Sequence, residues 1–113
     1  MNDFESVKQL IIELMKEKAG SFDGNSLEAD YKLDWEVELS ERLGNALYNM
    51  SRAASAKENA DDVMLKVALM NSRVDFMDLA NFFRDIYDDL DALVKKPIWP
   101  EIPKGFVYEK VSD

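Results

Sequence analysis

The fold of this chain is decided by residues 45–96, which have the sequence NALYNMSRAASAKENADDVMLKVALMNSRVDFMDLANFFRDIYDDLDALVKK. The stretch lies between Gly44 and Pro97 and contains neither glycine nor proline, the two residues that most disfavour an α-helix. Its apolar residues recur at nearly every third or fourth position, the period that places them on one face of a helix. The stretch therefore predicts an all-α fold.

Two helices and a turn are expected in the first part of this region. One helix runs from Asp34 to about Ala54, because its apolar residues gather on one stripe. Residues 51–59 contain no apolar residue larger than alanine, and Asn59 is suited to cap a helix, so we place a turn there. The next helix, about Ala60 to Ser72, is apolar almost all the way round and is expected to be the most buried element. The stripe of the first helix comprises Trp35, Leu39, Leu43, Ala46, Leu47, Met50 and Ala54.

The second part predicts a long helix from Phe76 to about Val94. Asp75, with Asp78 three residues later, is suited to cap it, but one rod kinked through residues 71–75 fits the sequence equally well. A wide apolar stripe is expected along this helix, because its apolar residues step by four and three. It comprises Phe76, Ala80, Phe83, Tyr87, Leu90 and Val94, with Leu79, Ile86 and Leu93 alongside.

The two ends of the chain complete the predicted architecture. A helix from Asp3 to about Ala19 is expected, with Asn2 as its cap. Prolines at 97, 100 and 103 exclude helix beyond that point. We therefore expect residues 1–96 to form a bundle of four helices, or of five helical segments. Residues 97–113 are expected to be an extended tail, rich in proline and aromatic residues, that packs on the bundle or on a partner.

The composition narrows the available chemistry. The chain has no cysteine and no histidine, which excludes disulfides, thiolate or imidazole metal ligands and serine–histidine catalysis. Its formal charge of −9, without a concentrated basic patch, disfavours direct binding to nucleic acid or to a membrane. An acidic N-terminus and the lack of an apolar run of about 20 residues predict a cytoplasmic protein. No cofactor is expected.

An acidic stripe is the first candidate for a binding site. Asp78, Asp85, Asp88 and Asp89 are expected to lie opposite the apolar stripe of their helix, near its C-terminal end. Aspartates there oppose the helix dipole, which invites a functional explanation. The stripe is either a solvated face or a partner-binding surface, and one version of the second has these carboxylates imitate the phosphates of DNA.

Four carboxylates in the middle of the chain form a second pattern. Glu38 and Glu41 are followed, after sixteen residues, by Glu58 and Asp61. The pattern resembles the ExxE and ExxD pair with which MazG-like all-α nucleoside triphosphate pyrophosphatases hold magnesium between two helices. The resemblance implies that these four residues are Mg²⁺ ligands of such an enzyme, for which carboxylate oxygens are suited. Because Glu38 and Glu41 face away from the apolar stripe of their helix, a solvated face is the alternative.

The tail supplies the third candidate. Trp99, Phe106 and Tyr108 are large apolar side chains on a segment that cannot join the bundle as helix. They either fold back over the open end of the bundle or dock on a second copy or another protein.

These features predict a non-enzymatic, acidic, helical interaction module, an adaptor or inhibitor that acts on another protein through its surface. Self-association is expected, with a two-fold dimer as the commonest form, because a helix that is apolar all round needs cover on every side. A magnesium-dependent nucleoside triphosphate pyrophosphatase of the MazG-like kind is the alternative function.

Overall fold

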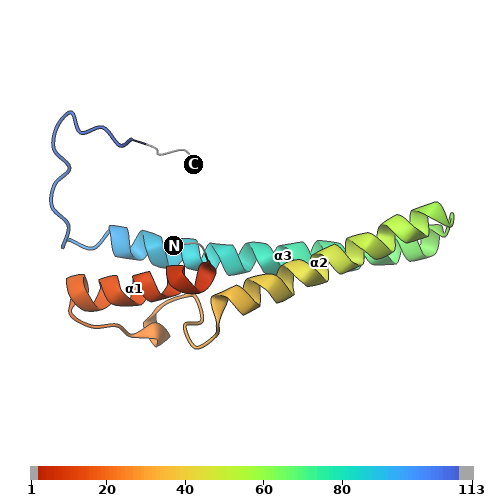
Figure 1. Ribbon diagram of the computed structural model, residues 1–113, viewed down its shortest axis with the longest axis horizontal. Coiled ribbons are helices and arrows are strands. Elements are labelled where there is room, and N and C mark those ends of the chain that lie inside the picture. Colours follow the sequence, from red (N-terminus) through yellow and green to blue (C-terminus); the bar gives the residue numbers. More distant parts are fainter. Residues whose placement is uncertain (1–2, 110–113) are drawn as a thin grey trace.

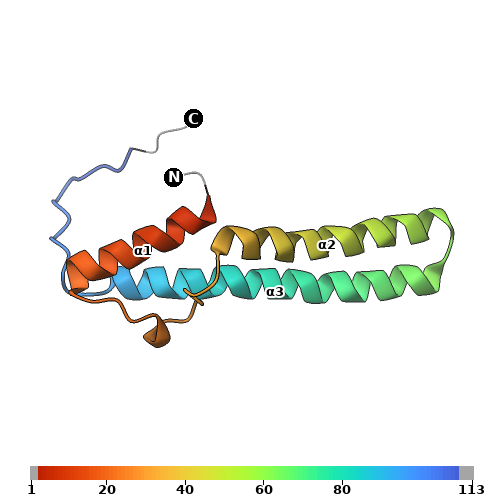
Figure 2. The same cartoon turned by 60° about the horizontal axis from the view of Figure 1, so that its bottom comes forward.

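The computed structural model describes residues 3–109, and these residues form three α-helices. They are α1 (Phe4–Ala19), α2 (Trp35–Glu58) and α3 (Asp62–Val94), with a short 3-10 turn, η1 (Gly24–Ser26), between the first two. Helices α2 and α3 form a long antiparallel hairpin, and α1 lies beside the C-terminal part of α3 (Figures 1 and 2). The all-α prediction is confirmed, whereas the predicted count of four helices is wrong.

Helix α3 is one continuous element of 33 residues, about 50 Å long at 1.5 Å per residue. The expected break between Ser72 and Phe76 is absent, so the alternative of a single rod is confirmed. Asp75 does not cap a helix. Its carboxylate accepts a hydrogen bond from the side-chain amide of Asn49 on α2, and this contact joins the two helices.

Helix α2 also continues further than expected. The turn predicted for residues 51–59 is confined to residues 59–61, because α2 ends at Glu58. Ala53 and Ala56 are only 3% and 4% exposed, since their small side chains let α3 approach closely. Asp61, rather than Asn59, caps the next helix, and its carboxylate accepts the backbone N–H of Met64 at 3.0 Å.

A line of residues spaced alternately three and four apart is buried or half-buried along the inner side of the hairpin, and we call it the seam. Most of its residues in the outer half of the hairpin are small or polar. On α3 the line continues past the start of α2 and there faces α1 and the loop of residues 20–34. The seam comprises Trp35, Leu39, Arg42, Ala46, Asn49, Ala53 and Ala56 on α2 and Leu65, Ala68, Ser72, Asp75, Leu79, Phe82, Ile86, Asp89 and Leu93 on α3.

The seam differs from the predicted apolar stripes. Phe76 and Tyr87, expected to be buried, are 46% and 60% exposed, because the buried line of α3 runs through the neighbouring positions. The segment expected to be the most buried, residues 60–72, exposes most of its large side chains, Val63 at 77% among them. Both expectations were wrong because only one side of α3 is covered by α2.

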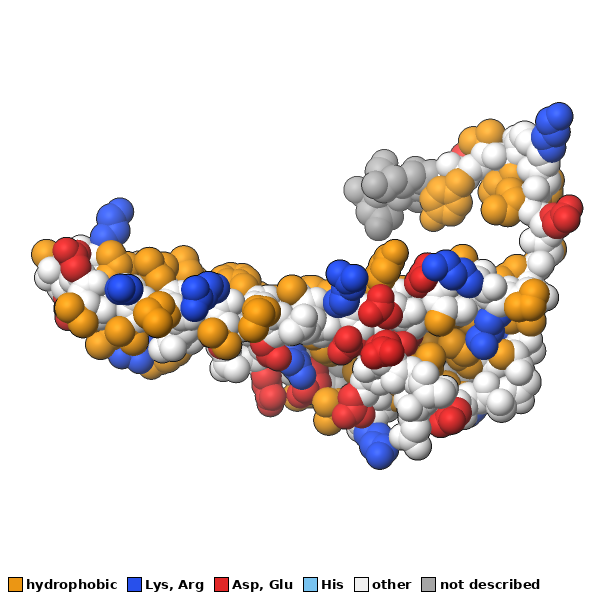
Figure 3. Space-filling model, turned by 180° about the vertical axis from the view of Figure 1, so that it is seen from behind, with side chains coloured by type: hydrophobic (Ala, Val, Ile, Leu, Met, Phe, Trp, Pro, Cys, Tyr) orange, Lys and Arg blue, Asp and Glu red, His pale blue; other side chains and the backbone are white. Residues whose placement is uncertain are grey.

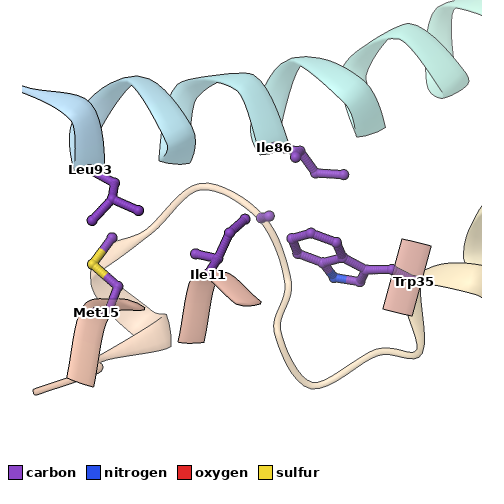
Figure 4. Packing of buried hydrophobic residues seen from close by; sticks show 6 residues of the cluster. Ile11, Met15, Trp35, Ile86 and Leu93 are labelled. Atoms are coloured by element: carbon purple, nitrogen blue, oxygen red, sulfur yellow. The ribbon is translucent and has the colours of Figure 1, made fainter. Parts of the chain in front are cut away.

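A compact hydrophobic core lies where the three helices meet. Figure 4 shows Ile11 and Met15 of α1 facing Ile86 and Leu93 of α3, with the indole of Trp35 beside them. Trp35 is 1% exposed, and its ring packs edge-on against Phe82 with the ring centroids 6.4 Å apart. Large interlocking side chains of this kind supply most of the burial energy of a small domain.

Polar contacts attach α1 to the start of α2. Asp3 caps α1 by accepting the backbone N–H of Ser6 at 2.8 Å; the predicted cap, Asn2, lies outside the described residues. Glu5 accepts the backbone N–H of Trp35 at 3.1 Å and pairs with the Lys8 ammonium at 2.7 Å. The Lys8 side chain is buried and also donates to the carbonyl oxygen of Leu33.

The molecule is elongated, with principal extents of 60 × 35 × 21 Å. Its radius of gyration of 19.5 Å exceeds the roughly 13 Å of a compact domain of this length. Residues 43–77, the outer half of the hairpin, project away from the core, and we call them the arm. The base comprises α1, the loop of residues 20–34, the first turns of α2 and residues 78–94 of α3.

Candidate functional site: the apolar flank of the hairpin

One side of the hairpin carries a line of exposed, large apolar side chains. Each of them directly follows a seam residue in the sequence, as Leu43 follows Arg42 and Phe76 follows Asp75. Because α2 and α3 are antiparallel, positions that follow seam residues on either helix face the same side of the hairpin. We call this line the apolar flank; it comprises Leu43, Leu47 and Met50 on α2 and Leu69, Phe76 and Phe83 on α3.

The apolar flank stays open because the arm is only two helices thick. Leu47 is 57% exposed and Phe76 is 46% exposed, although both are large hydrophobic residues. The seam beside them contains alanine and serine, whose small side chains bring the helices close together and leave no room for the flank to turn inward. Contiguous apolar surface of this kind marks an interaction site more often than isolated exposed residues do.

The flank ends at the base, where α1 begins. The ring of Phe83 lies 5.6 Å from that of Phe4 and 5.7 Å from that of Phe82, measured between centroids. The backbone N–H of Phe4 donates to Glu36 Oε2 at 2.8 Å, which places an acidic side chain at this end of the flank. Phe4 of α1 and Glu36 therefore lie at this end of the flank. Beyond it, exposed residues continue along α3 in the base, namely Tyr87, Leu90 and Val94.

Charge is divided unevenly between the arm and the rest of the chain. The arm holds four basic and four acidic residues and is formally neutral, so the remaining ten basic and nineteen acidic residues carry the whole charge of −9. Figure 3 shows hydrophobic side chains along the arm and acidic ones gathered where it joins the base. The arm's charged residues are Arg52, Lys57, Lys66, Arg73, Glu58, Asp61, Asp62 and Asp75.

The predicted acidic stripe is only partly on the surface. Asp89 is 1% exposed and lies in the seam, so its assignment to an exposed partner-binding stripe is wrong. Asp78 pairs with Arg42 at 2.6 Å, and Asp88 lies 3.8 Å from the guanidinium of Arg84. Basic partners thus offset two of the remaining carboxylates, and Asp85 is half-buried beside them.

Arg42 connects the two helices at the edge of the base. Its guanidinium donates to Asp78 at 2.6 Å and to Glu38 at 3.1 Å, and lies over the ring of Phe82. Burial lowers the pKa of this guanidinium, but the two carboxylates outweigh that effect and raise the pKa above its ordinary value. A permanently charged Arg42 therefore occupies a seam position where an apolar residue is usual.

The four carboxylates of the MazG-like pattern form two pairs, and the two pairs lie at opposite ends of α2. Glu38 is near the start of α2 and pairs with Arg42, whereas Glu58 is the last residue of that helix. Twenty residues of helix separate them by about 30 Å. Asp61 is occupied as the cap of α3, and Glu41 is exposed. Within residues 3–109, no group of three or more acidic side chains is placed to hold a metal ion.

The tail is anchored at its start and exposed beyond. The Trp99 indole donates to the carbonyl oxygen of Leu93 at 2.9 Å, and the Lys18 ammonium lies 5.7 Å from its ring. Phe106 and Tyr108 are 62% and 84% exposed. In both ribbon views the tail rises from the end of α3 and then turns back in the direction of the arm, apart from the helices (Figures 1 and 2). Residues 110–113 of the predicted tail lie outside the described residues.

Sequence reasoning merged the apolar flank with the buried seam. The signal that separates them is the size and polarity of residues at heptad spacing. Ala46, Ala53 and the polar Asn49 alternate by three and four, as buried positions of a close helical pair do. The larger leucines and phenylalanines one position later then belong to the flank.

Comparisons of the chain with protein-family models, with curated proteins and with solved structures give no significant match. Among the described residues, none of the helices has the length and apolar character needed to cross a membrane.

Proposed function

We propose that this protein is a non-enzymatic, helical interaction module that associates with a second copy of itself through the apolar flank of the hairpin. The observation that carries the proposal is the line of six exposed, large apolar side chains on one side of the hairpin, five of them in the two-helix arm and Phe83 at the edge of the base. Covering that line requires another surface of similar length, and a second hairpin completes a four-helix arrangement of the usual kind.

The charge distribution supports contact at the arm. Two molecules of charge −9 repel each other when their acidic surfaces meet. The arm is formally neutral, so two arms approach each other without that repulsion. Apolar side chains at the contact then gain the free energy of leaving water.

Analytical ultracentrifugation over a wide concentration range tests the proposal. We expect a species of twice the 13.0 kDa chain mass that dissociates on dilution. Leu47→Glu and Phe76→Glu place a charge on the flank without touching the seam, and each is expected to raise the dissociation constant at least tenfold, about 1.4 kcal/mol. A mass of one chain at every concentration would refute self-association.

Val74→Glu is the matched control. Val74 is 52% exposed, close to the exposure of Leu47 and Phe76, but it lies on the opposite side of α3 from the flank. The substitution adds the same charge to the same arm, so it is expected to leave the dissociation constant within about threefold of the wild-type value. Equal weakening by all three substitutions would assign the effect to charge rather than to the flank.

A further inference from the structure

Four residues on α2 form a line that carries opposite charges at its two ends and apolar side chains between them. Glu36, Leu43, Met50 and Lys57 are spaced seven residues apart, and each directly follows a seam residue, so all four lie on the flank side of α2. From the base to the tip of the arm the order is acidic, apolar, apolar, basic. The midpoint of the line falls halfway between Leu43 and Met50.

This order is complementary to itself when the line is reversed. A two-fold axis through the midpoint, perpendicular to the arm, sets Glu36 of one copy against Lys57 of the other. The same axis sets Leu43 against Met50. At 1.5 Å per residue the two charged pairs lie about 16 Å on either side of the axis.

The apolar flank residues of α3 also form a line, and its centre lies at nearly the same height along the hairpin as the midpoint of the α2 line. Leu69 and Phe83 are each seven residues from Phe76, and all three lie on the apolar flank. The hydrogen bond from Asn49 to Asp75 fixes the register of the hairpin and brings the midpoint of the α2 line level with the turn of α3 that contains Phe76. One two-fold axis therefore serves both helices.

Building on the proposed function, we infer that two copies pair their arms in antiparallel orientation about this axis, with Glu36 of each chain facing Lys57 of the other. The antiparallel orientation places the two acidic bases at opposite ends of the dimer, farther apart than the roughly 8 Å screening length in physiological salt. A parallel pair would set base beside base, Glu36 beside Glu36 and Lys57 beside Lys57. The charge pattern thus favours a second copy as the partner and an antiparallel orientation of the two arms.

A charge swap tests the orientation. In the antiparallel dimer Lys57→Glu creates two repulsive pairs, and we expect the dissociation constant to rise about tenfold at low salt. Adding Glu36→Lys restores two attractive pairs and is expected to recover most of that loss. Arg52→Glu makes the same change of charge on the opposite side of the arm and serves as the control. In a parallel dimer, Lys57→Glu exchanges one repulsion for another and leaves the affinity unchanged.

Glu36→Lys also removes the acceptor for the backbone N–H of Phe4, so the charge swap can disturb the fold. A distance measurement that keeps Glu36 therefore tests the orientation independently. The chain has no cysteine, so Glu58→Cys gives a single site for a nitroxide spin label at the tip of the arm. Antiparallel arms place the two labels about 35 Å apart by double electron–electron resonance. Parallel arms place them at the spacing of neighbouring helices, on the order of 10 to 15 Å.

The two proposals fail in different ways. A chain that stays monomeric refutes the proposed function itself. A dimer that is weakened by Phe76→Glu, is indifferent to Lys57→Glu and gives the short spin-label distance keeps the interaction module but overturns the antiparallel orientation. Weakening by Lys57→Glu, recovery by Glu36→Lys and the long distance together support the orientation.

Discussion

Tyr31 donates its phenolic hydrogen to Oδ2 of Asp89 across 2.8 Å, and this bond closes the loop between α1 and α2 onto α3. Asp89 also accepts the backbone N–H groups of Glu28 and Ala29, at 2.8 and 3.0 Å. Burial and the hydrogen bond to this carboxylate raise the pKa of Tyr31 well above its ordinary value of 10.0. The phenol therefore remains a donor across the physiological pH range.

Replacing Asp89 by alanine is expected to lower the free energy of unfolding by about 3–5 kcal/mol. The substitution leaves three donors without their acceptor, two of them backbone N–H groups, and each orphaned buried donor costs about 1–3 kcal/mol. Tyr31→Phe removes one bond and is expected to cost about 1 kcal/mol. Urea unfolding, followed by circular dichroism and by tryptophan fluorescence, measures both.

Asp88→Asn is the control for this prediction. Asp88 neighbours Asp89 in the sequence but pairs loosely with Arg84 on the surface, at 3.8 Å. Its substitution is expected to change the unfolding free energy by no more than about 0.5 kcal/mol. Similar losses at the two positions would contradict the placement of Asp89 in the seam.

Stability is expected to fall in acid through Glu5. Partial burial raises the pKa of this carboxyl, but hydrogen bonds from the Lys8 ammonium, the Trp35 backbone and Gln9 outweigh it and hold the pKa below its ordinary value of 4.5. A depressed folded-state pKa gives stability that is complete above 4.5 and is lost as the pH falls through the lower, folded value.

Thermal melting between pH 3 and pH 7 checks the prediction for Glu5. The Glu5→Gln variant cannot titrate at this position, so its melting temperature should be lower than that of the wild type at pH 7. The gap between the two proteins should narrow as the pH falls below 4.5. A constant gap would show that Glu5 stabilises the fold by other means than its charge.

Ala60→Gly is expected to stabilise the hairpin by about 1 kcal/mol. Ala60 has a φ of 54°, a left-handed conformation that costs a residue with a Cβ roughly 1–2 kcal/mol. The turn is the type in which glycine is preferred, because the N–H of Asp61 bonds the carbonyl oxygen of Ala56 at 2.9 Å and that of Ala60 bonds Lys57. Ala80→Gly, at an exposed position in the interior of α3, should instead cost about 1 kcal/mol. Urea midpoints of the two variants should shift in opposite directions.

Ser72→Ala is also expected to stabilise the protein, by about 1 kcal/mol. The hydroxyl of Ser72 is buried in the seam, and within residues 3–109 it makes no hydrogen bond. Alanine fits a seam that already contains Ala68 and removes the unpaired polar group. Ser51→Ala, at an exposed position of α2, reports the gain from helix propensity alone. A destabilised Ser72→Ala variant would indicate that the hydroxyl has a partner in solution.

The helical content of the chain followed from its sequence, but the choice of buried face did not. Helix α3 carries apolar residues on two adjacent lines, one through Ile86 and Leu93 and one through Phe83 and Leu90. Hydrophobic periodicity alone does not show which of the two lines is buried. Which line is buried depends on the partner helix. In the arm, the side of α2 that faces α3 carries alanines and Asn49 rather than large apolar residues.

The buried position of Asp89 was beyond sequence reasoning for a related reason. An aspartate near three others looks solvated, and burial is tolerated here only because Glu28, Ala29 and Tyr31 supply donors from a loop about sixty residues away. The continuation of α2 from Ser55 to Glu58 was missed because the small and polar residues of positions 51–59 were interpreted as a turn. In a close helical pair they mark the tightest contact.

One helix of this protein spans two regions of unequal local stability. In the base, α3 is held by the packed side chains of Ile86 and Leu93, whereas in the arm it is held mainly through Ala68 and Ser72. Because little apolar surface is buried there, we expect amide hydrogens near the tip to exchange with solvent through openings that need less free energy than unfolding the base. In the proposed dimer, the encounter of two arms would therefore order the tip of each arm as well as bury its apolar flank.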